Sequence, residues 1–416
     1  MLLNYLTIAW KVLLRHPFYT FITLFGISLT LTVLMLLTAF LDHAIGAHYP
    51  ETRRDRTLYV ERMSLEDSAQ TRSTNGPLSF RFLSQYTKNL SQAEQVTVFS
   101  TTRRSSAFSG TQRIMVDIRF TDVPFWQVAQ FAFLEGRPYN AQDLASNRSV
   151  VVITDGFKRA YFGSNTDSVV GQPVTIENVR YTVVGVVRGV PPTRLFTTSD
   201  LYFPYTTPKS NYQSSGWRGD YQAMLLARTA ADRPRLKAEF QGRMAQVPMP
   251  VVQYGFKYNI MTVYSEPFLD NYLNAILNGN SGLRYTFLGL LTFLVLMLVG
   301  LPAVNLVSLN VGRMLERASE IGVRKAFGAP VRSLLWQFII ENIFVTLLGG
   351  VIALLLTSML LLLINQSGWI PYADLTINGL VFLVSLLIAL LFGLLSGVLP
   401  ALRMARLNII SALRAS

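Results

Sequence analysis

Residues 315–329 read LERASEIGVRKAFGA and form a charged island between two long apolar segments. Successive residues of a helix turn by about 100°, so Ala318, Gly322 and Ala326 share one narrow face made of small side chains. Gly322 in the middle of a helix costs about 1 kcal/mol relative to Ala, a cost that makes sense if another backbone packs closely on that face. The island therefore predicts a helix with a packing face.

The opposite face of this predicted helix is charged. Glu316, Glu320 and Arg324 form a row at i,i+4 spacing, and Gly328 followed by Pro330 supplies a helix stop. The Glu320–Arg324 pair stabilises a helix by about 0.2–0.5 kcal/mol, whereas the Glu316–Glu320 pair costs a similar amount. A cationic partner near this row would offset the repulsion between Glu316 and Glu320. The alternative is an ordinary solvated loop.

The composition predicts a membrane protein. Of the 416 residues, 50% are hydrophobic and only 15% are charged, and the mean hydropathy is +0.33. Four apolar runs without a charged residue are each near the ~20 residues that cross a bilayer: 17–41, 285–309, 343–364 and 377–399. We assign transmembrane helices to residues 17–41, 283–309, 334–364 and 377–400.

The positions of Lys and Arg in the short flanking segments predict the orientation, since cytoplasmic loops are enriched in these residues. They precede the first run, fill the loop at 310–333 and follow the last run, in the tail 401–416, whereas the short loop 365–376 has none. Both termini and the charged island are therefore expected to be cytoplasmic. Residues 42–282 are expected outside, in the periplasm of a bacterial inner-membrane protein.

Residues 1–16 place apolar side chains mostly on one side of a helix, with Lys11 and Arg15 available to lipid phosphates. This pattern predicts an amphipathic helix on the inner membrane surface. A cleaved signal peptide is the alternative, but its apolar core is ~7–15 residues and the run here is longer.

The outside region is predicted to be a mixed α and β domain. Alternating or β-rich runs predict strands at 57–60, 115–120, 150–153, 174–176, 181–187 and 223–227, and helical patterns occur at 80–89, 156–162 and 232–246. A hairpin is expected across Asn178. The chain has no cysteine, so this domain must rest on a hydrophobic core without disulfides. The net charge of +13 comes from scattered residues, so we expect no nucleic-acid partner.

Several residues in the spans predict kinks or close helix packing. Proline frees a carbonyl within a helix, paired glycines let helices approach, and a carboxylate at the membrane edge is costly unless solvated or paired. The residues concerned are Pro302, Asn305, Glu341, Gly349, Gly350, Gly393 and Gly397. For Glu341 two interpretations stay open: a side chain reaching for water, or a buried polar contact that holds the helix.

No motif predicts catalysis in this chain. The sequence lacks G-x-x-x-x-G-K-[ST], H-E-x-x-H and G-x-S-x-G. His43 and His48 end the first span with no cysteine to join them, so a membrane-interface pair is favoured over a metal site. Asp155 and Glu177 have no spacing that singles out a catalytic pair. We expect a protein that is not an enzyme and holds no metal or cofactor.

Residues 316–329, ERASEIGVRKAFGA, resemble the E-R-x-x-E-I-G-[IV]-R-[RK]-A-[LF]-G-A signature of the MacB-like and FtsX-like ABC transporter permeases. QFIIE at 337–341 and LLGG at 347–350 are similar to the segments that follow this signature. LEGRP at 134–138 and VVGVV at 183–187 resemble motifs of the family's extracytoplasmic domain. PALRMA at 400–405 and ALR at 412–414 resemble the closing motifs, although Asn408 and Ile409 stand where the family often has an acidic residue and proline.

The resemblance implies a permease with four transmembrane helices and a two-lobed outer α+β domain inserted between the first and second helices. One lobe is expected to be split, 42–112 plus 208–282, and the other inserted, 113–207. The permease is expected to pair with a second copy or a paralogue, and to bind a separate cytoplasmic ABC ATPase dimer that holds ATP and Mg²⁺. Residues implied to couple to that ATPase are Glu316, Arg317, Glu320, Ile321, Gly322, Arg324, Lys325, Phe327 and Gly328.

The function implied by the resemblance is the transmission of ATP-driven motion to the outer domain, driving export of a peptide, toxin, antibiotic or similar compound. A periplasmic adaptor and an outer-membrane channel are possible further partners. The same fold also serves lipoprotein extraction and the regulation of cell-wall hydrolases, and both alternatives stay open. A third alternative, from another class, is a membrane-anchored sensor without an ATPase.

Overall fold

The computed structural model describes the chain except for residues 1–6, 8–9, 12, 16, 70–71, 111, 147, 165, 208–209, 215, 254, 278–282, 298–299, 301–330 and 406–416. The chain divides into two compact units. The helical unit comprises Met1–His43, Gly282–Trp369 and Asp374–Ser416. The globular unit comprises Ala44–Ser281 together with the short segment Ile370–Ala373.

Long apolar helices make up the helical unit: α2 (Pro17–Ile45), α11 (Val331–Ser367) and α12 (Gly379–Ala405). Among the described residues, Thr20–Ile45 and Ile339–Ser367 are long and apolar enough to cross a membrane, and Leu283–Met297 and Gly379–Leu391 are shorter apolar helices. The predicted second span, 283–309, lies partly outside the described residues. Within the predicted amphipathic segment 1–16, the described positions are helical.

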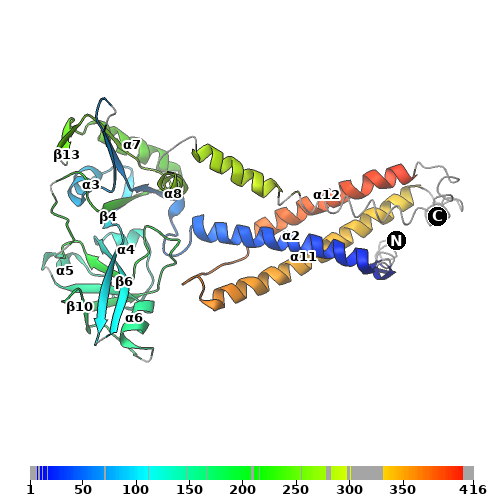
Figure 1. Ribbon diagram of the computed structural model, residues 1–416, viewed down its shortest axis with the longest axis horizontal. Helices are drawn as coiled ribbons and strands as arrows, with labels where there is room; N and C mark the ends of the chain where they lie inside the picture. Colours follow the sequence, from blue (N-terminus) through cyan, green and yellow to red (C-terminus); the bar gives the residue numbers. More distant parts are fainter. Residues whose placement is uncertain are drawn as a thin grey trace. The chain divides into compact units, whose positions relative to one another are not determined.

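The long helices of this unit are drawn in Figure 1; they bury some apolar side chains against one another and expose others. Ile27 and Leu31 of α2 are buried against Val345 and Ala353 of α11. Large apolar side chains elsewhere on the same helices are exposed, including Phe18 at 69%. Exposed apolar surface of this extent is typical of contact with lipid.

The globular unit is built mainly on one large sheet. Its strands are β1 (Thr57–Val60), β4 (Ala93–Ser100), β5 (Arg103–Ser109), β6 (Gln112–Thr121), β7 (Phe133–Gly136), β8 (Val150–Thr154), β9 (Pro173–Ile176), β10 (Val179–Val187), β11 (Leu201–Pro204) and β12 (Tyr221–Ala227). Their order is β1-β12-β4-β6-β11-β8-β10-β9-β5, with β7 beside β10. Because β5 also pairs with β6, the strands from β6 to β5 close into a ring.

Smaller elements complete this unit. The strands β2 (Met63–Glu66), β3 (Ser73–Gly76) and β15 (Ile260–Val263) form one small sheet, and β13 (Val251–Gln253) pairs with β14 (Phe256–Tyr258). The helices are η1 (Arg54–Arg56), α3 (Phe80–Thr87), α4 (Phe125–Val128), α5 (Ala141–Ala145), α6 (Asp155–Phe162), η2 (Ala230–Asp232), α7 (Arg233–Ala245) and α8 (Phe268–Ile276).

Two hydrophobic cores cover the two faces of the sheet. Every residue of β12 is buried, and its side chains alternate between the cores because successive residues of a strand point to opposite faces. Leu225 packs with Phe240 of α7 in one core, whereas Leu226 packs with Phe125 of α4 in the other. The helices α3 and α7, labelled in Figure 1, therefore contribute to one core and α4 to the other.

The predicted strands and helices of this unit are confirmed where the sequence pattern was strong. The predicted hairpin is present: β9 pairs with β10, and Glu177 and Asn178 turn the chain with φ of 47° and 65°, the left-handed backbone that tight hairpins require. The predicted boundary between the two lobes, at residues 112 and 113, falls at the start of β6. The strand just before this boundary, β5, pairs with β6 at every residue. The division into two lobes stays a prediction.

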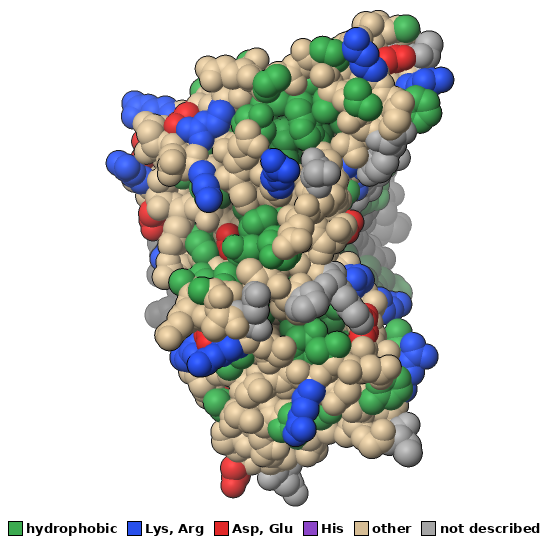
Figure 2. Space-filling view, turned by 90° about the vertical axis from the view of Figure 1, so that its left-hand side faces the viewer, with side chains coloured by type: hydrophobic (Ala, Val, Ile, Leu, Met, Phe, Trp, Pro, Cys, Tyr) green, Lys and Arg blue, Asp and Glu red, His purple; other side chains and the backbone are tan. Residues whose placement is uncertain are grey.

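Positive side chains are dispersed over the globular unit. Figure 2 shows Lys and Arg separated by apolar and uncharged surface on the face that it draws. Many are also paired with carboxylates, as Lys237 is with Glu266 at 2.8 Å between Nζ and Oε2. This face lacks the continuous basic stripe that is typical of nucleic-acid-binding proteins.

Candidate functional site

The predicted ATPase-coupling helix lies in the stretch 301–330, outside the described residues. The same applies to the predicted kink at Pro302 and Asn305. The residues concerned are Glu316, Arg317, Glu320, Ile321, Gly322, Arg324, Lys325, Phe327 and Gly328. Their coupling role stays a prediction.

The glycine pair of α11 lies where this helix contacts two neighbours. A Cβ atom on Gly349 would lie 2.7 Å from Cγ2 of Ile27 in α2, and one on Gly350 would lie 2.7 Å from Cδ1 of Leu386 in α12. Each contact is closer than a methyl group tolerates, so the two glycines let α11 approach both helices. Gly393 and Gly397 lie within α12, and their predicted role in close helix packing stays a prediction.

Glu341 is buried in α11, with only 4% of its surface exposed, beside Asn342 at 6%. Thr346, one turn further along, donates its hydroxyl to the carbonyl of Asn342 at 2.8 Å. Of the two interpretations of Glu341, its burial favours a polar contact packed within the helical unit over a side chain that reaches water.

The end of α2 is capped by a buried arginine that follows it in sequence. The last carbonyls of a helix have no partner within the helix and carry partial negative charge. Nη1 of Arg54 donates to the carbonyls of Ala44 at 3.0 Å, Ile45 at 3.0 Å and Gly46 at 3.2 Å. Arg194, also fully buried, donates to the carbonyl of Gly46 at 2.7 Å. Ala44, Ile45 and Gly46 belong to the globular unit, so the two cations hold the end of this helix inside that unit.

Arg54 is itself held by a buried network. Its Nε donates to Oε2 of Glu51 at 2.7 Å, and the two side chains are 3% and 2% exposed. The guanidinium also lies 3.5 Å from the ring centroid of Phe268. Glu51 accepts two further hydrogen bonds, from Thr197 at 2.6 Å and from the Tyr59 hydroxyl at 3.0 Å. Burial, and then the charge of Glu51, raise the pKa of Tyr59 well above its usual value, which keeps its hydroxyl a donor.

Sequence reasoning missed this junction. The only signal was the mixed-charge run ETRRDR at 51–56, directly after the first apolar run. The run contains three arginines, and only the tertiary structure decides that Arg54 is the buried one, whereas Arg53 and Arg56 pair with Glu94 near the surface.

The two motifs of the outer domain, LEGRP and VVGVV, pack against each other. Gly136 of β7 and Gly185 of β10 are directly paired across the two strands. Gly136 has φ of 65°, and a Cβ atom there would overlap the carbonyl oxygen of Val184; one on Gly185 would lie 2.5 Å from the carbonyl of Arg137. Both positions therefore exclude side chains, which explains the glycines in both motifs.

The charged residues of LEGRP fasten the elements around it. Arg137 donates to both carboxylate oxygens of Asp143, at 2.7 and 3.3 Å, and this hydrogen bonding is the main reason that the pKa of Asp143 lies below its usual value. Asp143 and Asn140 also form the capping box of α5. Glu135 pairs with Lys158 and accepts from the backbone N–H of Val169 at 3.1 Å. The motif is structural in this chain.

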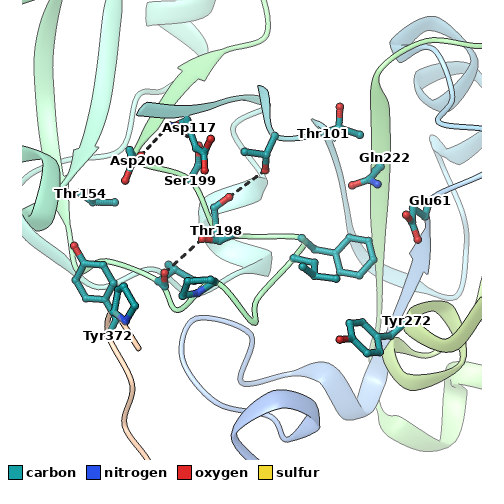
Figure 3. A pocket seen from close by; sticks show the side chains of 16 residues that line it. Glu61, Thr101, Asp117, Thr154, Thr198, Ser199, Asp200, Gln222, Tyr272 and Tyr372 are labelled. Carbon is teal, nitrogen blue, oxygen red and sulfur yellow. Dashed lines mark hydrogen bonds between the residues drawn. The ribbon is translucent and has the colours of Figure 1, made fainter. Parts of the chain in front are cut away.

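A cavity of about 540 Å³ lies in the globular unit (Figure 3). Its lining includes three carboxylates, Glu61, Asp117 and Asp200. The Asp117 backbone N–H donates to Oδ2 of Asp200 at 2.8 Å. The neighbouring loop is tied down by the buried Arg119, which donates to the carbonyls of Leu195 at 3.0 Å and Thr198 at 3.2 Å. The cavity is thus preformed and acidic.

Comparison with models of protein families shows to which family this chain belongs. A model of the MacB-like periplasmic core domain matches residues 20–243, the region that contains most of α2, its arginine cap and both paired motifs. The chain belongs to the MacB-like permease family. A model of the FtsX-like permease C-terminal region matches residues 289–409, which contain α11 and most of α12. Members of this family are inner-membrane ABC transporter permeases with a periplasmic domain.

Relatives of this MacB-like permease include two proteins named macrolide export ATP-binding/permease protein MacB. The one from Pasteurella multocida is 28% identical over 289 residues, which are 70% of this chain and 41% of the relative. The one from Bordetella avium is 28% identical over 285 residues, 67% of this chain and 40% of the relative. The chain therefore spans less than half the length of these relatives.

Among solved structures, the periplasmic region of MacB from Actinobacillus actinomycetemcomitans is similar to the MacB-like part of this permease. The sequence identity is 15%, the TM-score is 0.36, and the match covers 54% of this chain and 94% of the solved chain.

Proposed function

We propose that this chain is the permease subunit of an ABC transporter that couples ATP hydrolysis by a separate cytoplasmic ATPase to motion of its periplasmic domain. Transport by this route is mechanical: motion of the membrane helices is passed outward, and the cargo need not pass between them. The chain would lie in the bacterial inner membrane with both termini inside and would act as a dimer with a second permease subunit.

The observation that carries this proposal is the capped end of α2. The helix continues without a break from Pro17 to Ile45. Arg54 donates to its last carbonyls, those of Ala44 and Ile45, and Arg194 donates to the carbonyl of Gly46, which follows it. A flexible linker at this point would absorb a displacement of the helix, whereas a helix end held by buried charges is suited to passing it on. Within this network Glu51 is held by a further hydrogen bond from Thr197.

The energy must come from residues outside this sequence, which contains no nucleotide-binding P-loop motif. The charged island at 315–329 is the proposed contact with the ATPase, through Glu316, Glu320, Arg324 and Lys325. Its packing face, with Ala318, Gly322 and Ala326, would lie against the permease.

Efflux is the transport task that we favour, because the MacB relatives are named for macrolide export. A periplasmic adaptor and an outer-membrane channel would then complete the path out of the cell. The proposal covers the transport task and does not name the exported compound.

The test is Glu320→Lys in the full chain, expressed with its partner ABC ATPase. We expect loss of ATPase co-purification in detergent and loss of export, measured as resistance to a macrolide antibiotic. Asp167→Lys, at an exposed position of the globular unit, is the matched charge reversal and should change neither readout. Unchanged co-purification of the Glu320→Lys protein would remove the island from this role.

A second variant separates coupling from assembly. Arg54→Met should leave ATPase co-purification intact and reduce export, because the island is unchanged while the junction at the end of α2 is lost. Export is compared at a temperature where tryptophan fluorescence shows that the variant is still folded. If no ATPase co-purifies with the unaltered chain, the sensor without an ATPase becomes the better explanation.

A further inference from the structure

The cavity of the globular unit has an unbalanced charge. It is lined by Glu61, Asp117 and Asp200, and among the described residues that line it none is basic. Arginines lie outside the lining: Nε of Arg62 is 3.4 Å from Glu61, and Nε of the largely exposed Arg104 is 3.8 Å from Asp117. The buried Arg119 also lies beside the cavity, where it donates to the lining residues Leu195 and Thr198. Burial raises the pKa of both Glu61 and Asp200. The negative charge in the cavity is therefore only partly compensated.

A buried amide also faces this space. Gln222 of β12 is 7% exposed and lines the cavity, with its amide directed into it in Figure 3. Among the described residues, its side chain has no hydrogen-bond partner. The amide is open to the cavity, so its N–H groups and its oxygen are available to a polar group of a bound ligand.

Aromatic side chains stand at both ends of the cavity. Figure 3 shows Tyr372 at the end that holds Asp200 and Thr154, and Tyr272 near Glu61 and Gln222. The face of an aromatic ring attracts cations, so these tyrosines add to the attraction of the carboxylates.

Tyr372 comes from the loop between α11 and α12, and its ring packs into a space bordered by two glycines of the globular unit. A Cβ atom on Gly156 or on Gly189 would overlap its ring. Neither glycine has a positive φ. Glycine is therefore needed at both positions to leave space for the ring, and not to allow an unusual backbone conformation. Tyr372 itself is held at φ of 58°, a left-handed backbone that is costly for a non-glycine residue.

The contact is reinforced by Asp155. Its Oδ1 accepts from the backbone N–H of Gly189 at 2.8 Å. Burial, and then the charge of Asp155, raise the pKa of Tyr372 to about 12, which keeps the hydroxyl protonated. The segment Ile370–Ala373 accordingly belongs to the globular unit.

We propose that this cavity binds an aromatic organic cation, with its charge toward Asp117 and Asp200 and its rings against Tyr372, so that the loop between α11 and α12 forms one wall of the site. The volume of about 540 Å³ suits a ligand of drug size. Since the wall is joined covalently to α11 and α12, ligand binding stabilises the docked loop, and the docked loop equally strengthens binding. The site is independent of the proposed coupling to an ATPase.

Binding is measured with the full chain in lipid nanodiscs, without an ATPase, by fluorescence titration. The probe is ethidium, a planar aromatic cation that carries two amino groups, and fluorescein serves as an anionic aromatic of similar size. We expect ethidium to bind and fluorescein to bind at least tenfold more weakly. Equal affinity for the two dyes would overturn the proposal, because the carboxylates would then play no part.

Variants locate the site. Asp200→Asn and Tyr372→Ala should each weaken ethidium binding about tenfold, the loss expected for one charge-assisted or cation–π contact in a buried site. Asp232→Asn, at a carboxylate away from the cavity, is the control and should bind as the unaltered chain does. Unchanged affinity in both Asp200→Asn and Tyr372→Ala would place the probe elsewhere and refute the proposal.

The packing of the Tyr372 ring is tested by replacing two glycines, one beside the ring and one away from it, with alanine. Gly189→Ala should displace the ring and weaken ethidium binding, whereas Gly242→Ala, where a Cβ atom meets nothing within 4 Å, should not. If Gly189→Ala destabilises the fold, the double variant with Tyr372→Ala removes the overlap and should restore stability while binding stays weak. Full-strength binding by that double variant would contradict a wall formed by Tyr372.

Discussion

Nε of Arg54 lies 2.7 Å from Oε2 of Glu51, and both side chains are almost fully buried at the end of α2. The same guanidinium caps the helix through its other nitrogen, Nη1. One ion pair thus holds the end of an apolar helix at residues that belong to the globular unit, in a network where Tyr59 and Thr197 also bind Glu51. The pair lies in the segment that sequence patterns did not single out.

Replacing Arg54 by Met should destabilise the periplasmic domain by about 3–5 kcal/mol, because it leaves the Glu51 carboxylate buried without its partner. The measurement is urea unfolding of the full chain in nanodiscs, followed by tryptophan fluorescence. Arg235→Met removes an arginine that is 77% exposed and should change stability by less than about 0.5 kcal/mol. A double variant, Glu51→Gln with Arg54→Met, should lose less than the sum of the single losses. Equal stability of Arg54→Met and Arg235→Met would disprove the structural role.

Alanine at Gly349 should be worse tolerated than alanine at Gly350. The new methyl group at Gly349 meets Cγ2 and Cβ of Ile27, at 2.7 and 3.0 Å, close to the backbone of α2. At Gly350 it meets Cδ1 of Leu386, the end of a flexible side chain that can turn away. We expect a loss of about 1–3 kcal/mol for Gly349→Ala and less than about 1 kcal/mol for Gly350→Ala.

Thermal unfolding of the purified chain in detergent checks this difference. Adding Ile27→Ala to Gly349→Ala removes the atoms that the new methyl group meets, so it should recover part of the lost stability. A ranking in which Gly350→Ala is the more damaging change would show that α11 and α2 do not pack as described.

Gly136→Ala should cost more stability than Gly110→Ala, although the two residues have similar φ values of 65° and 59°. The left-handed backbone alone costs an alanine about 1 kcal/mol. At Gly136 the added methyl group also overlaps the carbonyl oxygen of Val184, whereas at Gly110 it meets nothing within 4 Å. Urea unfolding should therefore show a loss of about 1 kcal/mol at Gly110 and about 2–4 kcal/mol at Gly136. Equal losses would mean that the β7–β10 pairing can shift.

Asp143→Asn should make stability less dependent on acid pH. Hydrogen bonds from Arg137 are the main cause of the lowered pKa of Asp143 in the folded chain. A carboxyl group whose pKa is lowered by folding stabilises the fold above its unfolded pKa, and this contribution disappears as the pH falls through the folded pKa. Because Arg137 is 49% exposed, solvent screening limits the expected loss at pH 7 to about 1 kcal/mol.

The measurement is urea unfolding of both proteins from pH 7 down to pH 3. The stability difference between the original chain and Asp143→Asn should be largest near neutral pH and should shrink below about pH 4, the usual pKa of an aspartate. A difference that stays constant over this range would show that the ionised carboxylate is not what Arg137 stabilises.

Strongly patterned strands of the periplasmic domain could be predicted from the sequence. The run at 150–153 and the hairpin around Asn178 have apolar or alternating residues and an asparagine suited to a tight turn, so local chemistry and tertiary structure agree. By contrast, β5 reads RRSSAFS and was missed. It is a strand because β6 pairs with it at every residue, and such pairing overrides weak local preference.

The sequence by itself determined the class of molecule. Apolar runs long enough for a bilayer, a polar domain between them and a charged segment at 315–329 follow from residue chemistry and spacing, whereas the helix at 315–329 stays a prediction. They do not depend on which distant residues meet.

Only the tertiary structure decided which charges are buried and what they bind. Arg54, among the three arginines of ETRRDR, turns inward because the end of α2, Glu51 and Phe268 surround it. Tyr372 lies in the globular unit because Gly156 and Gly189, from separate parts of the chain, leave room for its ring. Both outcomes are set by the desolvation of polar groups and by steric overlap, which depend on neighbours far away in sequence.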